Sequence, residues 1–284
     1  MKRSPRCISR MLVPIASIAL SVTGAYGEVV YNSIPSASLP PNVVSQAFEA
    51  TQTSEFGNAV NLDGGARQLT TIDVVMSDWA KKSDWPSVGT SAGYFHILTL
   101  NLYNVGPGGA VGSIVASDTI NAFVPWRPET TAACASNDGY GTGGADCYHG
   151  IASTVTFDFT SANVVLPNSL IFGLAFGTTD YGYALNPYLL QPGPYDSLNI
   201  GVESGGSPTV GSDVYPGSVY WNTSTAAWYT DGGASGVGVF RQDTNWSPYS
   251  PEVTINADAP EPGTFVLLGG GFVLMAAIRR RRAA

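Results

Sequence analysis

The chain contains one spacing typical of a catalytic serine. Gly89-Thr90-Ser91-Ala92-Gly93 fits the G-x-S-x-G pattern of a hydrolase nucleophile elbow, and His96 follows closely. An elbow needs a strand before the serine and a helix after it, whereas here Trp85-Pro86-Ser87 precedes the motif and a strand pattern follows. With only His96 and His149 in the chain, a triad or a multi-histidine metal site has few members. We interpret the motif as a turn that leads into a strand.

The acidic residues form no recognisable catalytic pair. All 21 Asp and Glu residues are scattered between Glu28 and Glu261, and no spacing among them selects the general acid and base of a glycosidase. We therefore expect no catalytic residues and no enzymatic activity. A secreted hydrolase is the least favoured of three function classes, and it would require convergent carboxylates or a triad centred on Ser91.

Cys134 and Cys147 bracket a polar, glycine-rich loop. In an oxidising compartment such a pair forms a disulfide, and two free thiols are the alternative. Three side chains inside the loop, Asn137, Asp138 and Asp146, carry oxygen ligands that suit calcium. Their spacing does not match an EF-hand, so we favour an ordinary solvated loop, with a structural calcium as the alternative. We expect no other metal and no cofactor.

Aromatic residues provide a binding hypothesis. Four of them are predicted to lie in loops or at strand ends, where exposed rings stack on sugar faces while amide and acidic groups bind hydroxyls: Trp126, Trp221, Trp228 and Tyr229. Large aromatic side chains also pack in cores and at their rims, which is the alternative for each ring. Binding of extracellular polysaccharide by these residues is the second function class.

Composition and charge exclude some partners. Hydrophobic residues make up 44% of the 284 residues and charged residues only 12%, which favours a folded core over disorder. The formal net charge is −8, and because eight of the 13 basic residues lie at the two ends, the segment from Glu28 to Glu261 holds five basic and 21 acidic residues, a net charge of −16. Such an acidic body argues against nucleic acid as a partner.

Hydrophobic alternation with a period of two predicts β-strands. The pattern is strongest near Leu98–Leu102, Thr154–Phe159 and Leu170–Phe176. Weaker strands are predicted at residues 70–76, 113–124, 198–202, 219–229 and 237–242, separated by Gly, Pro, Asn and Asp. No stretch of the body predicts a capped amphipathic helix. We expect an all-β fold, an antiparallel β-sandwich that could be jelly-roll-like.

The N-terminus has the order of a secretory signal peptide. A basic stretch precedes an apolar run over residues 11–22, and Ala25-Tyr26-Gly27 places small residues at the two positions that a signal peptidase reads. We predict a signal peptide over residues 1–27, handled by the secretion translocon and removed after Gly27. An uncleaved membrane anchor is the alternative, although the apolar run is short for a span.

The C-terminus carries the most specific pattern in the chain. Pro260-Glu261-Pro262 is followed by an apolar run over residues 264–278 and then by the basic cluster Arg279, Arg280, Arg281 and Arg282. Arginines hold their end of a span on the cytoplasmic side. The eight strongly apolar residues of the run supply only roughly −2.4 to −4.8 kcal/mol of insertion free energy, so we expect a helix that anchors transiently in the inner membrane.

This tail closely resembles the PEP-CTERM sorting domain of Gram-negative bacteria. The resemblance covers about the last 25 residues. It implies recognition by an exosortase-type sorting enzyme, removal of the tail, and delivery to the cell envelope or to an exterior rich in exopolysaccharide. We expect three parts: the signal peptide, a sandwich body over residues 28–258, and a sorting and transmembrane tail over residues 259–284.

The body is also similar to a β-rich family of secreted bacterial proteins. The resembling segments are Tyr31–Pro35, Leu39–Asn42, Thr53–Gly57, Leu100–Val105 and Tyr195–Asn199. This resemblance implies no particular activity. The leading hypothesis is therefore an exported cell-surface or extracellular-matrix protein whose body is structural or adhesive, ahead of the carbohydrate-binding module and the hydrolase.

Overall fold

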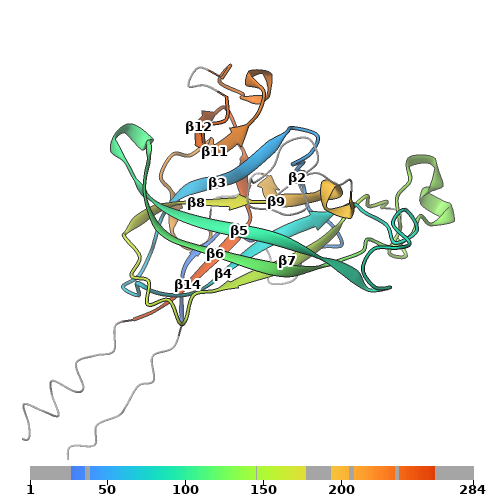
Figure 1. Ribbon diagram of the computed structural model, residues 1–284, viewed down its shortest axis with the longest axis horizontal. Helices are drawn as coiled ribbons and strands as arrows, with labels where there is room; N and C mark the ends of the chain where they lie inside the picture. The colour runs from blue at the N-terminus through green and yellow to red at the C-terminus, as the bar shows by residue number, and fades with distance from the viewer. Residues whose placement is uncertain are drawn as a thin grey trace, which may run out of the picture.

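Two antiparallel β-sheets pack face to face as a sandwich (Figure 1). The computed structural model describes residues 27–35, 39–144, 146–176, 193–204, 208–233 and 237–259. The strands within them are β1 (Glu28–Asn32), β2 (Ser45–Gln46), β3 (Thr53–Asn61), β4 (Gln68–Asp78), β5 (Gly93–Val105), β6 (Val111–Pro125), β7 (Ile151–Asp158), β8 (Ser169–Ala175), β9 (Leu198–Ser204), β10 (Ser212–Asp213), β11 (Ser218–Thr223), β12 (Arg241–Thr244), β13 (Tyr249–Pro251) and β14 (Val253–Asp258). Short 3₁₀ helices occur at Pro107–Gly109 (η1), Ala132–Asn137 (η2), Pro194–Ser197 (η3) and Ala226–Trp228 (η4).

The first sheet is organised around β4. Along one edge β4 pairs with β7, and along the other it pairs with β14 over its first half and with β9 near its end. The order is β1-β14-β4-β9-β13, with β2 added beside β9. We call this sheet A.

The second sheet, sheet B, has the order β12-β11-β3-β8-β5-β6, and β10 pairs with β3. Its longest pairing is the β5–β6 hairpin, which runs from Gly93 opposite Pro125 to Val105 opposite Val111. The turn of this hairpin contains Gly108 at φ 66°, a backbone conformation that favours glycine.

The core lies between the sheets. On β4, Ile72, Val74 and Met76 face inward and are fully buried, and on β8 Phe172 and Leu174 are fully buried as well. Each such side chain contributes roughly 1.5–3 kcal/mol through removal of apolar surface from water.

The predicted all-β, antiparallel sandwich is therefore confirmed. The three strongest strand predictions coincide with β5, β7 and β8, except that Phe159 and Phe176 lie one residue beyond the ends of β7 and β8.

Two weaker strand predictions are partly wrong. The strand predicted at residues 219–229 ends at Thr223, and η4 follows. The strand ends there because Ser224 and Thr225 both donate their hydroxyls to the Gln52 side chain instead of continuing the strand pairing. The strand predicted at residues 237–242 begins only at Arg241.

The two described ends of the body lie together. β1 pairs with β14, with Glu28 opposite Ala257, so residues 27 and 259 leave from the same end of the sandwich (Figure 1). Gln68, the first residue of β4, pairs with Asp258 at this end, and β4 then extends away from it to Asp78. At about 3.3 Å per residue, the end of β4 lies about 33 Å from the chain ends.

Candidate functional site

Trp79 stands at the far end of the sandwich, directly after β4. Its side chain is 47% exposed, an unusual state for a tryptophan in a protein with a large core. A hollow of about 480 Å³ opens beside it. The lining consists of Ser45, Ala47, Glu49, Ala50, Trp79, Ser197 and Asn199. We call this the Trp79 hollow.

The indole ring of Trp79 is held in one orientation. Its Nε1–H donates to Ser77 Oγ at 3.1 Å, and Ser77 in turn donates to Asn42 Oδ1 at 2.7 Å. The ring also lies against Gly150, and the His149 imidazole sits 5.9 Å away, centroid to centroid. Because these contacts set the ring before any ligand arrives, little side-chain entropy is lost when something stacks on it.

Polar groups complete the Trp79 hollow. The Asn199 amide donates to the backbone oxygen of Ser197 at 3.1 Å, which fixes the amide at the wall. The hydroxyls of Ser45 and Ser197 and the carboxylate of Glu49 belong to the same lining. A fixed aromatic face beside hydroxyl, amide and carboxylate groups is an arrangement that can bind a sugar ring, which has apolar faces and a polar edge.

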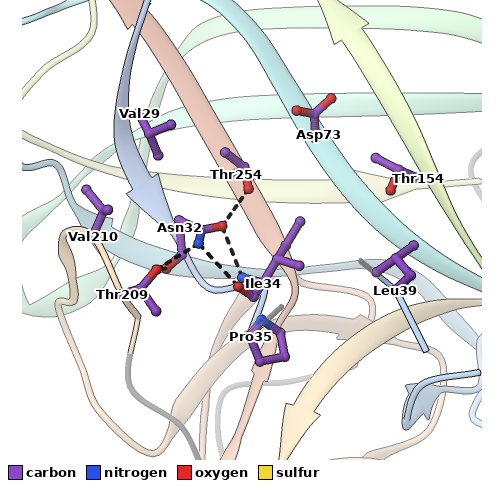
Figure 2. A pocket seen from close by; sticks show the side chains of 10 residues that line it. All are labelled: Val29, Asn32, Ile34, Pro35, Leu39, Asp73, Thr154, Thr209, Val210 and Thr254. Atoms are coloured by element: carbon purple, nitrogen blue, oxygen red, sulfur yellow. Dashed lines mark hydrogen bonds between the residues drawn. The ribbon is translucent and has the colours of Figure 1, made fainter. Parts of the chain in front are cut away.

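A larger hollow of about 510 Å³ lies on the outer face of sheet A (Figure 2). Figure 2 shows the hydrogen bonds of Asn32, which lines this hollow. Its side-chain N–H donates to Thr209 Oγ1 and to the Ile34 oxygen, and its Oδ1 accepts from the Ile34 backbone N–H and from Thr254. Asp73 accepts a hydrogen bond from Thr156. Asn32, Thr209 and Thr254 thus satisfy one another, which indicates a structural role for these three residues.

A smaller pocket continues from this hollow, and Ile34, Pro35 and Leu39 line both. It holds two carboxyl groups, Glu203 and Glu252, that sequence spacing did not select. Burial and then the charge of Glu203 raise the pKa of Glu252 to about 7. The residues meet because β9 and β13 pair, a long-range contact that no local spacing records.

Three of the four predicted sugar-stacking rings are buried, so the expectation that they are exposed is wrong. Trp126, Trp221 and Tyr229 are each at most 7% exposed. Trp126 donates its indole N–H to the Thr90 oxygen at 2.8 Å and Trp221 donates to Thr53 Oγ1 at 2.7 Å. Each ring thus finds its polar partner inside the protein and is used for packing.

Tyr229 and Trp228 are adjacent but have different surroundings. The Arg241 guanidinium lies over the Tyr229 ring at 3.8 Å and forms an ion pair with Asp231 at 2.7 Å. Trp228, in η4, is 42% exposed. Of the four predicted rings, Trp228 alone presents a large exposed surface.

The Cys134–Cys147 disulfide is present, with Cα atoms 5.7 Å apart. Within its loop Asp138 accepts hydrogen bonds from Lys81 Nζ at 3.0 Å and from Arg127 Nη2 at 2.9 Å, and a further one from Thr130. The hydrogen bonds from Thr130 and Lys81, followed by the charges of Lys81 and Arg127, lower the pKa of Asp138 to about 2.

The calcium hypothesis for this loop gains no support from the geometry. Two cations already engage the carboxylate of Asp138. Asn137 and Asp146 are exposed. Across the described part of the chain, no three His, Cys, Asp or Glu side chains gather in a way that could hold a metal ion.

Ser91 and His96 do not form a catalytic pair. Ser91 is exposed in the bend before β5, and a strand rather than a helix follows it. His96 is fully buried, with its ring edge-on to Phe176 at 5.4 Å. Burial lowers the pKa of His96 to about 3, so the imidazole is neutral.

The sorting residues Pro260, Glu261 and Pro262 and the arginines at 279–282 lie outside the described residues, as do residues 1–26. Among the residues that are described, no helix is both long and apolar enough to cross a membrane.

Residues 258–282 match the family model described as the PEP-CTERM protein-sorting motif. The chain therefore carries a sorting signal of exported bacterial envelope or surface proteins, which an exosortase-type enzyme recognises. Neither the curated proteins nor the solved structures contain a match to the chain.

Proposed function

We propose that this chain is an exported surface or extracellular-matrix protein whose body is adhesive and holds extracellular polysaccharide in the Trp79 hollow. In this proposal a signal peptide directs the chain through the secretion translocon of a Gram-negative bacterium. The C-terminal tail then halts in the inner membrane until the exosortase-type enzyme acts on it. The body performs no catalysis.

One observation carries the sugar-binding part of this proposal. Trp79 is a large aromatic side chain that stays exposed although its orientation is fixed by Ser77 and Gly150. A side chain fixed by packing alone would be expected to turn inward, because burying it is favourable. A preorganised exposed ring beside the Asn199 amide is suited to stack on a sugar.

The position of the Trp79 hollow fits a protein sorted through its tail. The chain ends leave the sandwich where β1 and β14 pair, and Trp79 lies about 33 Å away at the other end of β4. A body held or delivered by its C-terminus would therefore present the Trp79 hollow outward.

Affinity electrophoresis in gels containing the exopolysaccharide of a host with the sorting machinery tests the proposal. The wild-type chain should be retarded, and Trp79→Ala should weaken the binding about 5- to 10-fold, because an aromatic contact contributes about 1–1.5 kcal/mol. Trp228→Ala is the matched control, since it removes another exposed indole. Equal retardation of both variants would contradict a site at Trp79.

The sorting part is tested separately by intact mass and fractionation in the same host. We expect loss of residues up to about Gly27 and of the tail near Pro260, with the body outside the inner membrane. A full-length chain retained in the inner membrane would contradict the proposed processing.

A further inference from the structure

A second pocket lies beneath the segment that joins β1 to β2. The described part of this segment is fixed on the outer face of sheet A: the Pro41 oxygen accepts from Ala152 N at 3.0 Å and the Val44 oxygen from Val202 N at 2.8 Å. The pocket measures about 220 Å³, which equals the volume of several water molecules at about 30 Å³ each. We call it the glutamate pocket.

Its walls are almost entirely apolar. Seven of its nine lining residues are aliphatic or proline, Leu39, Val43 and Val44 among them, and the other two are Glu203 and Glu252. The buried Glu252 carboxyl thus lies among mostly apolar side chains, a costly arrangement for an ionised group, whereas Glu203 is partly exposed.

Glu252 is a buried lining residue of this pocket, and one of its carboxyl oxygens has no hydrogen-bond partner. Its side chain is only 3% exposed, and the buried Oε2 accepts no hydrogen bond. The Glu252 backbone N–H donates to the Gly201 oxygen, two residues before Glu203 on β9, so the two glutamates are diagonal neighbours across the strands. Long side chains at such positions can reach each other.

The cations of the body are engaged elsewhere. Lys81 and Arg127 bind Asp138, and Arg241 binds Asp231. Arg67 donates to Asn168 and to backbone oxygens, and Lys82 donates to backbone oxygens. Among the described residues, therefore, no basic side chain serves as a counter-ion for the two glutamates.

We propose that the glutamate pocket binds a primary alkylammonium group, with the ammonium on Glu252 and Glu203 and the methylene chain along Leu39, Val43 and Val44. A free aliphatic amine and a lysine side chain both carry this chemistry. The ammonium supplies the charge and the hydrogen-bond donor that Glu252 lacks. The site does not depend on the proposed polysaccharide binding.

Other ligand classes fit less well. A sugar ring needs partners for many hydroxyls, and apart from the two glutamates no lining residue of this pocket has a polar side chain. Calcium takes six to eight oxygen ligands, which apolar walls do not supply.

Isothermal titration calorimetry of the full chain at pH 8 tests the inference, with n-butylamine as the probe and n-butanol as its uncharged counterpart. We expect saturable binding of n-butylamine, at least tenfold weaker binding in Glu252→Gln, and no change in the matched control Glu129→Gln. n-Butanol binding as tightly as n-butylamine, or an unchanged affinity in Glu252→Gln, would overturn it. Calcium binding that excludes the amine would do so too.

Nα-acetyl-lysine amide distinguishes a lysine side chain from a free aliphatic amine as the source of the ammonium group. Tighter binding than n-butylamine supports a lysine side chain of a protein partner, and weaker binding supports a free amine.

If Glu252→Gln does not fold, the wild-type chain still provides a test. n-Butylamine should raise Tm more at pH 8, where Glu252 is ionised, than at pH 5. Glu203 and Asp213 lie nearby and also titrate, so they contribute to the same pH dependence. Equal shifts at both pH values would contradict the inference.

Discussion

A Cβ atom at Gly150 would lie 2.5 Å from Cδ1 of Trp79. Real Cβ contacts are not this short, so the indole ring can keep its position only because residue 150 has no side chain. Gly150 lies three residues after Cys147, the residue at which the disulfide closes the loop. The loop and the end of β4 together therefore determine where Trp79 points.

Gly150→Val should displace the Trp79 ring and reduce retardation by exopolysaccharide about as much as Trp79→Ala does. The strands next to the substitution should persist, because the close contacts involve the side chains of Trp79 and Ser77 and no backbone atom. Gly144→Ala is the control, since a Cβ there meets nothing within 4 Å. Unchanged retardation of Gly150→Val in affinity gels would show that the ring position is irrelevant to binding.

Replacing both Cys134 and Cys147 by serine should destabilise the body by about 3 kcal/mol, because the bond closes a loop with a sequence separation of 13 residues. Urea unfolding followed by tryptophan fluorescence measures this. Wild-type protein unfolded with reductant present should match the double variant. A midpoint that is the same with and without the bond would mean that the loop is already held by Asp138 and its partners.

Strands in which hydrophobic and polar residues alternate could be predicted from the sequence. β3 shows why strands without this alternation could not be predicted. From Thr53 to Val60 every residue of β3 is buried, because its outer face is covered too: Glu55 there accepts hydrogen bonds from Asn101 and Tyr103. A strand buried on both faces has no period of two to detect.

The candidate site was harder to predict than the fold. Trp221 and Trp79 are both tryptophans near strand ends, yet one is in the core and the other exposed. The difference depends on Thr53, which accepts from the Trp221 indole across the sheet, and on Gly150, which is distant in sequence from Trp79. Glu203 and Glu252 likewise meet only through the pairing of β9 with β13.

His96→Phe should make the protein less sensitive to acid. Burial lowers the pKa of His96 to about 3, below its ordinary value of 6.5. Below pH 6.5 the unfolded chain binds a proton that the folded chain excludes, so stability falls as the pH falls toward 3, by up to about 4 kcal/mol. The difference in unfolding free energy between variant and wild type, measured at pH 7 and pH 4, isolates this effect. An unchanged difference would place the imidazole in contact with solvent.

Glu252→Gln should abolish a loss of folding stability that the wild-type protein suffers as the pH rises toward neutrality. Burial, followed by repulsion from Glu203, raises the pKa of Glu252 from 4.5 to about 7. Between these values the folded chain holds a proton that the unfolded chain has released, so stability falls as the pH rises from about 4.5 through 7. The glutamine variant keeps the shape and carries no charge to bury.

We therefore expect wild-type protein to lose on the order of 1–2 kcal/mol of unfolding free energy through Glu252 between pH 5 and pH 8, and the variant to retain it. Burial also raises the pKa of Glu203, so part of the pH dependence should remain in the variant. Chemical unfolding of both proteins at the two pH values provides the comparison. If wild type and variant lose the same unfolding free energy between pH 5 and pH 8, Glu252 ionises in the folded protein at little cost. The carboxylate then does not lack a partner, and the basis for alkylammonium binding is removed.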